Sequence, residues 1–167
     1  MKQRIVESGI TFDIEQDHLY YIEQSKLVQN TKYFKTPEFV CLRGDDVVVL
    51  EAKSTVPSPM SKADFKTYLD EIRLKFFNSM ALLNACWSKC NPVELQTMPA
   101  TLQQQKMHQA QFQLYLVIAN AKKEWLVDVN NAFKSELQIL FKIWNIPDTA
   151  FRAITKEKAI QLGLAVE

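Results

Sequence analysis

Residues 36–55, TPEFVCLRGDDVVVLEAKST, decide the fold that the sequence predicts. The runs 38–43 and 47–53 are apolar and rich in β-branched residues, and the GDD between them supplies turn residues that tolerate a positive φ. The stretch therefore predicts a β-hairpin. Glu51 and Lys53 end its second strand, and because alternate residues of a strand share a face, we expect their side chains to be neighbours.

The register of this hairpin decides whether a second carboxylate joins them. If the turn is the two-residue Gly44-Asp45, or a four-residue loop, Glu38 stands directly opposite Glu51 with Cβ atoms about 4.5–5.5 Å apart. An Asp45-Asp46 turn sets Glu38 opposite Lys53 instead. A three-residue loop without a bulge turns Glu38 to the other face, because side chains alternate along a strand.

A pair of carboxylates at this distance has a chemical consequence. The two groups repel, and without a cation one of them is pushed towards its protonated form. A magnesium or manganese ion, which prefers oxygen ligands, resolves that repulsion. Lys53 beside the ion could orient a water molecule or stabilise negative charge on a phosphate under attack. The alternative is an ordinary ion pair of Glu51 and Lys53 at the solvated end of an edge strand.

Length and composition favour one domain over residues 1–167. The chain is 47% hydrophobic, which suffices for one core, and 167 residues are few for two domains. Its 20 basic and 19 acidic residues give a net charge of +1, so contact with nucleic acid requires a local patch. An odd number of cysteines favours reduced thiols, and no apolar leader or membrane-spanning run is visible. We therefore expect a soluble, cytoplasmic protein.

The rest of the chain alternates between strand and helix patterns. The expected elements are apolar runs at 10–14 and 18–22 forming a small hairpin or a strand leading into a helix, an amphipathic helix from about 62 to 86 capped by Ser61, a mobile loop or short helix within 90–110, an interior strand at 112–120, a helix from about 128 to 144, an edge strand at 151–155 and a terminal helix capped by Thr155. This order predicts an α/β fold with a mixed β-sheet flanked by helices.

Pro37-Glu38 followed by Glu51-Ala52-Lys53 resembles the P-D … (D/E)-x-K pattern of the PD-(D/E)XK, or restriction-endonuclease-like, nuclease superfamily. Glu38 replaces the usual Asp, and twelve residues separate the two acids. The resemblance implies a restriction-endonuclease-like mixed sheet in which Glu38 and Glu51 bind magnesium or manganese, while Lys53 assists attack of water on a phosphodiester. It also implies a further acidic ligand before the hairpin. Glu23 matches that position, and Glu15 and Glu7 are also available.

The leading hypothesis is thus a metal-dependent nuclease that hydrolyses phosphodiester bonds in DNA or RNA. By the same resemblance, small members act in restriction, mobile-element or phage-defence settings, where a partner protein can supply target recognition. The rival hypothesis is a non-enzymatic interaction or regulatory module that retains the nuclease-like fold, which the near-neutral charge favours. A third is an unrelated α/β protein whose hairpin carries an E-x-K by chance.

Other polar residues give weaker signals. The two histidines, His18 and His108, have no second ligand at a suitable spacing, so we do not expect them to bind metal. Basic residues on the long helix could contact backbone phosphates, but acidic residues are interspersed with them, which favours a solvated face of mixed charge. These basic residues are Lys62, Lys66, Arg73 and Lys75.

Overall fold

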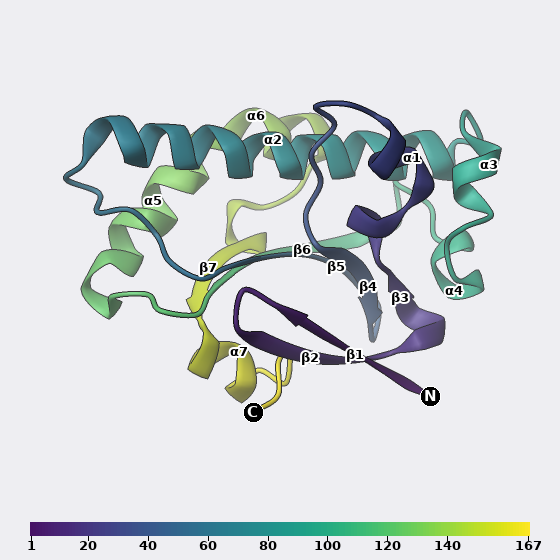
Figure 1. Cartoon of the computed structure of the whole chain (residues 1–167). Coiled ribbons are helices and arrows are strands. Elements are labelled where there is room, and N and C mark those ends of the chain that lie inside the picture. The colour runs from purple at the N-terminus through teal and green to yellow at the C-terminus, as the bar shows by residue number, and fades with distance from the viewer.

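The computed structural model describes residues 1–167 as two β-sheets and seven α-helices (Figure 1). The strands are β1 (Lys2–Glu7), β2 (Ile10–Glu15), β3 (Leu19–Tyr20), β4 (Phe39–Arg43), β5 (Asp46–Lys53), β6 (Gln111–Ile118) and β7 (Phe151–Thr155). The helices are α1 (Lys26–Asn30), α2 (Lys62–Trp87), α3 (Pro92–Leu95), α4 (Ala100–Gln103), α5 (Leu126–Glu136), α6 (Gln138–Trp144) and α7 (Lys156–Gln161). None of these helices has the length and apolar character needed to cross a membrane.

The β4–β5 hairpin has the register that the two-residue turn predicts. Phe39 lies opposite Leu50 and Arg43 opposite Asp46, so the turn is Gly44-Asp45. Gly44 has a φ of +62°, a conformation that glycine adopts without steric cost. The sequence signal was sufficient here because turn length and turn residues together fix the register of a hairpin.

Replacing Gly44 by alanine is expected to lower the free energy of unfolding by about 1 kcal/mol. A Cβ at this position would meet no atom within 4 Å, so the cost comes from the positive φ alone. Urea denaturation measures it, with the exposed neighbour Asp45→Ala as the matched control. An alanine variant as stable as the wild type would mean that this turn does not hold the backbone at a positive φ.

The larger sheet is mixed and places β5 in its interior. The strand order is β3-β4-β5-β6-β7, with β3, β4 and β5 antiparallel in succession and β5, β6 and β7 parallel. The parallel pairing of β5 with β6 requires a crossover, which contains α2. The predictions of an interior strand at β6 and an edge strand at β7 are confirmed. The edge-strand alternative for Glu51 and Lys53 is wrong, since β4 and β6 flank their strand.

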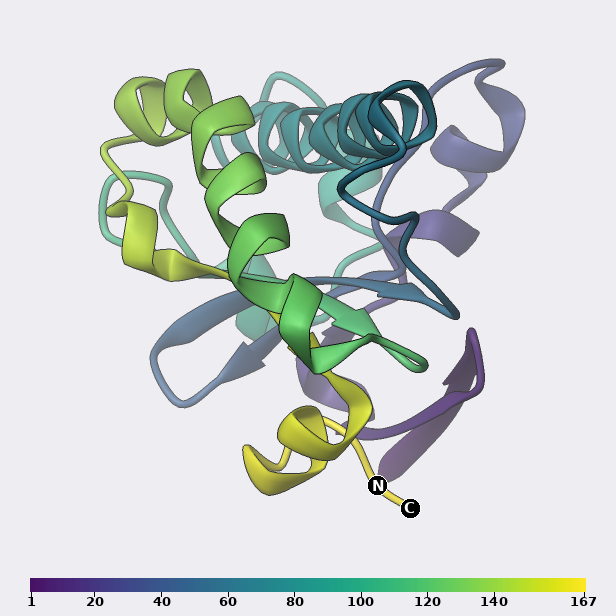
Figure 2. The same cartoon turned by 90° about the vertical axis from the view of Figure 1, so that its left-hand side faces the viewer.

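The two faces of the sheet are covered differently (Figures 1 and 2). Helices α1, α2, α5 and α6 lie over one face, and the β1–β2 hairpin and α7 lie over the other. Val47 and Val49 belong to the core on the α2 side, whereas Val48, Leu50 and Ala52 belong to the core beneath the β1–β2 hairpin. By this alternation, Glu51 and Lys53 share the face that α2 covers.

The helix predicted over 128–144 is two helices, and that prediction is wrong in its continuity. Helix α5 ends at Glu136 and α6 begins at Gln138, with Leu137 between them at φ −89° and ψ 1°. Helix α5 also begins after Trp125 and not at Asp128. The change of direction lets the fully buried side chain of Leu137 join the core, so packing overrides the continuous apolar periodicity. Residues 90–110 likewise contain the two short helices α3 and α4.

The N-terminal hairpin differs from the expected one. Strand β2 pairs with β1 across a Ser8-Gly9 turn, whereas the run at 18–22 contains β3, which pairs with β4. Ser8 and Gly9 have φ values of +52° and +77°, as a tight two-residue hairpin turn requires. This turn places Glu7, the last residue of β1, at the tip of the hairpin.

Candidate active site

Glu51 and Lys53 lie together at the end of β5, as their spacing predicts. Glu51 is fully buried, and the Lys53 Nζ lies 3.3 Å from its Oε1 atom. The same Nζ lies 3.3 Å from Oε1 of Glu71 on α2. Lys53 is therefore held between two carboxylates with about a quarter of its side chain exposed.

A second lysine reaches Glu51 from α2. The Lys75 Nζ donates to Oε1 of Glu51 at 2.7 Å, and Lys75 is only 7% exposed. The expectation that Lys75 lies on a solvated helix face is therefore wrong. Lys75 follows Ile72 by three residues and precedes Ser79 by four, and both of these are fully buried, so helical spacing could have placed it inward.

Of the other basic residues predicted on the solvated helix face, Lys62 and Lys66 are exposed and Arg73 is partly exposed. Lys66 pairs with Asp70 at 3.0 Å and with Glu136 at 3.1 Å, and its side chain is 56% exposed. These contacts give the mixed charge that the interspersed acids predicted.

The two lysines act against the cost of burying Glu51. Burial raises the pKa of Glu51, and the charges and hydrogen bonds of Lys75 and Lys53 oppose that rise. For Lys53, burial disfavours the ammonium, but the charges of Glu51 and Glu71 outweigh it and raise the pKa of the amine. Lys53 therefore carries its positive charge at neutral pH.

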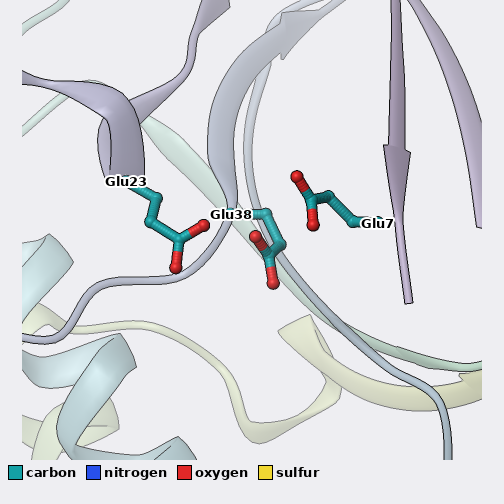
Figure 3. Close-up of side chains that lie close together, drawn as sticks. All are labelled: Glu7, Glu23 and Glu38. Carbon is teal, nitrogen blue, oxygen red and sulfur yellow. The ribbon is translucent and has the colours of Figure 1, made fainter.

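Glu38 lies just before β4 and is buried, with 6% of its surface exposed. Its backbone N–H donates to the carbonyl oxygen of Leu50 at 3.0 Å, which continues the hairpin by one residue. One carboxylate oxygen of Glu38 lies within 4.8 Å of one from Glu23 and one from Glu7. Figure 3 shows the three side chains close together. We call Glu7, Glu23 and Glu38 the acidic cluster.

The acidic cluster contains two of the three predicted metal ligands. Glu23, which the resemblance offers as a further ligand, lies in the 3-10 turn η2 (Ile22–Gln24) and close to Glu38. Glu7 joins them through the N-terminal hairpin, whereas Glu15 pairs with the N-terminal amine at 3.2 Å. Glu51 is not a member of this cluster, but it lies close enough for its charge to act on Glu38.

The environment of Glu38 disfavours its ionised form. Burial, a hydrogen bond with Glu23 and the charges of Glu51 and Glu23 together raise the pKa of Glu38 to about 9, against the opposing effect of Lys75. At neutral pH and without a cation, the Glu38 carboxyl group therefore holds a proton. The repulsion by Glu51 that the sequence predicts is one part of this rise in pKa, and burial is the largest part.

Several polar atoms at this site have no hydrogen-bond partner although they are buried. They include the Oε2 atoms of Glu38 and Glu51, the Thr36 Oγ1 atom and the Tyr68 hydroxyl group. Of these residues, Thr36 lines a cavity of about 380 Å³, together with Glu23, Lys35, Glu71 and Lys75. Buried acceptors without partners are costly, so their concentration here indicates a site built to bind a ligand.

Histidine and cysteine residues do not contribute to this site. Neither His18 nor His108 belongs to a group of side chains that could hold a metal ion. The three cysteines are free thiols, with Cys41 and Cys86 buried and Cys90 exposed. The available ligand atoms are therefore carboxylate oxygens.

Comparison with protein-family models, curated proteins and solved structures finds no match to this chain. The geometry and charges of the site are therefore the basis for assigning a function.

Proposed function

We propose that this protein is a metal-dependent nuclease that hydrolyses phosphodiester bonds and has the restriction-endonuclease-like fold that its motif resembles. The observation that carries the proposal is a pair of buried carboxyl groups with unpartnered oxygens, one just before β4 and one in the adjacent strand β5. The Oε2 atoms of Glu38 and Glu51 have no hydrogen-bond partner, and Lys53 lies beside Glu51. The mixed sheet, with helices over both faces, supports the fold part of the proposal.

The carboxylates fit a divalent metal ion. Glu38, Glu51 and Glu23 would hold magnesium or manganese, since these ions prefer oxygen ligands and the unpartnered Oε2 atoms of Glu38 and Glu51 can accept them. When bound, the ion would supply Lewis-acid polarisation of a phosphate oxygen and a lowered pKa of bound water. The protein's part is to keep these carboxylates together in a buried site.

The lysines have separate roles in this proposal. Lys53, charged and partly exposed, would stabilise the negative charge that grows on a phosphate during attack. Lys75 is buried and bonded to Glu51, so it is a positioning residue that fixes the Glu51 carboxylate. Lys35, in the lining of the adjoining cavity, is available to a backbone phosphate of DNA or RNA.

The setting of the reaction follows from the same resemblance. We place it in the cytoplasm, in restriction or phage defence, with a partner protein supplying target recognition. The alternative, a non-enzymatic interaction module that retains the fold, is favoured by the near-neutral charge of the chain and by the absence of a dedicated DNA-reading motif.

A cleavage assay tests the proposal. Single- and double-stranded DNA and RNA are incubated with the protein and magnesium or manganese, and we expect cleavage that a chelator abolishes. Lys53→Met removes the charge and should lower the cleavage rate by about 100-fold or more. Lys66→Met on the surface of α2 is the matched control and should leave the rate unchanged. Cleavage that survives Lys53→Met and Glu51→Gln would reject this site, and absence of cleavage by the wild type would favour the interaction module.

A further inference from the structure

We propose that Glu7, on the N-terminal hairpin, is a ligand of a divalent cation that Glu23 and Glu38 also bind. The inference rests on the proposed metal dependence and deepens it, because it adds a ligand from a segment outside the hairpin motif. The cation belongs to the class of magnesium and manganese, since all three ligands are carboxylates.

The spacing of the acidic cluster suits one ion. One oxygen from each carboxylate lies within 4.8 Å of the other two, and the three side chains converge from different elements in Figure 3. Oxygen ligands of one such ion lie about 2.0–2.6 Å from it, so their mutual separations fall between about 3 and 5 Å. The cluster therefore needs only small side-chain movements to surround a cation.

The charge of the cluster is not balanced by the protein. None of the three carboxylates forms an ion pair within 4.0 Å. The Oε2 atom of Glu38, a residue 6% exposed, is buried without a hydrogen-bond partner. A buried carboxyl group in a protein is normally paired, protonated or bound to a metal, and a cation would supply the partner that this oxygen lacks.

Glu7 is fixed in this place by contacts on both sides of the hairpin turn. The Tyr21 hydroxyl group donates to its Oε1 atom. The Ser8 hydroxyl group donates to the carbonyl oxygen of Ala52 at 3.1 Å, in the strand that carries Glu51, and the Lys156 Nζ donates to that of Gly9 at 3.0 Å. Ligands held in place before binding lose little freedom when the ion arrives.

The backbone conformation of Ser8 also supports a role of the hairpin turn in positioning Glu7. A serine at a φ of +52° is in a left-handed conformation that side chains other than glycine adopt at a cost of about 1 kcal/mol. Here that conformation turns the chain so that Glu7 meets Glu23 and Glu38. Local strain of this kind is characteristic of sites that position functional groups.

A titration with Mn²⁺ tests the inference without any measurement of cleavage. The free ion is followed by its electron paramagnetic resonance signal as it binds to the wild type, to Glu7→Gln and to Glu15→Gln. We expect one bound ion and an affinity that falls by about 10-fold or more in Glu7→Gln. Glu15→Gln changes a carboxylate on the same hairpin that lies outside the cluster, and its affinity should equal that of the wild type. Equal affinities in Glu7→Gln and the wild type would overturn the inference.

A second variant guards against loss of folding. Glu23→Gln changes the cluster from the 3-10 turn η2 and should weaken Mn²⁺ binding as much as Glu7→Gln does. Thermal unfolding by circular dichroism checks each variant, and Mn²⁺ should raise the midpoint only where it binds. Binding that depends on Glu7 in a protein without cleavage would reject the proposed function alone. Cleavage with Mn²⁺ binding that is indifferent to Glu7 would reject this inference alone.

Discussion

Replacing Lys75 by methionine is expected to lower the free energy of unfolding by about 3 kcal/mol. The substitution keeps the length of the side chain on α2 but removes the ammonium group that lies 2.7 Å from Oε1 of the fully buried Glu51. A buried carboxylate that loses its partner must take up a proton or remain uncompensated, and either outcome destabilises the fold. The effect stays near the lower end of the range for such losses because Lys53 still lies 3.3 Å from the same oxygen.

Chemical denaturation of Lys75→Met measures this effect, and Lys66→Met provides the control on the same helix. Lys66 is 56% exposed, so its removal should change the stability by less than about 1 kcal/mol. Combining Lys75→Met with Glu51→Gln removes the uncompensated charge, and the double variant should be more stable than the sum of the two single losses predicts. Strictly additive losses would show that Lys75 and Glu51 do not interact as a buried pair.

Replacing Glu38 by glutamine is expected to raise the free energy of unfolding, unlike Lys75→Met. The metal-free protein should be more stable by about 2 kcal/mol near pH 8. The folded-state pKa of about 9 lies far above the value near 4.5 of an unperturbed glutamate. Folding therefore takes up a proton between these two values, and stability falls as pH rises through that window. Glutamine has no proton to take up. We expect less than the full effect of this shift because neighbouring groups share the proton.

Denaturation midpoints between about pH 5 and pH 9, measured with a chelator present, test this prediction. The wild type should lose stability as pH rises relative to Glu38→Gln, and Glu15→Gln should follow the wild type. The groups that act on Glu38 are Glu23, Glu51 and Lys75, with the Tyr21 phenol and Glu7 nearby, and all of them remain in the variant. Parallel profiles for the wild type and Glu38→Gln would refute the raised pKa.

The same Glu38→Gln variant should lose Mn²⁺ binding and cleavage. If the replacement of a residue raises stability but removes function, that residue serves function and lowers the stability of the fold. The opposed signs would therefore separate a functional role of Glu38 from a structural one. A variant that became less stable at every pH would instead assign Glu38 to the packing of the hairpin.

The sequence was informative wherever the deciding interaction is local. The Gly44-Asp45 turn fixed the register that points Glu38 and Glu51 to one face, and the apolar run of β6 indicated an interior strand. Lys75 was assigned to the wrong face because the fully buried carboxylate that draws it inward, that of Glu51, is 24 residues away along the chain. The spacing of Lys75 from Ile72 and Ser79 indicates an inward face, but no local pattern identifies Glu51 as its partner.

The sequence does not indicate the break at Leu137 or the position of Glu7 in the acidic cluster, for a related reason. The apolar periodicity continues through Leu137, and only contact with the rest of the core decides that two helices fit better than one. Glu7 appeared as one of several available acids. Its position comes from the Ser8-Gly9 turn, in which both residues have a positive φ, and from contacts made by residues far along the chain.

Those distant contacts bear on when the acidic cluster can assemble during translation. The Lys156 bond to Gly9 joins residues 147 positions apart, and the backbone N–H of Val166 donates to Thr11 at 2.8 Å. Glu7 therefore leaves the ribosome long before the segment that secures its hairpin. A nascent chain carries the motif of β4 and β5 early, but it acquires a secured acidic cluster only after residues 156–166 have emerged.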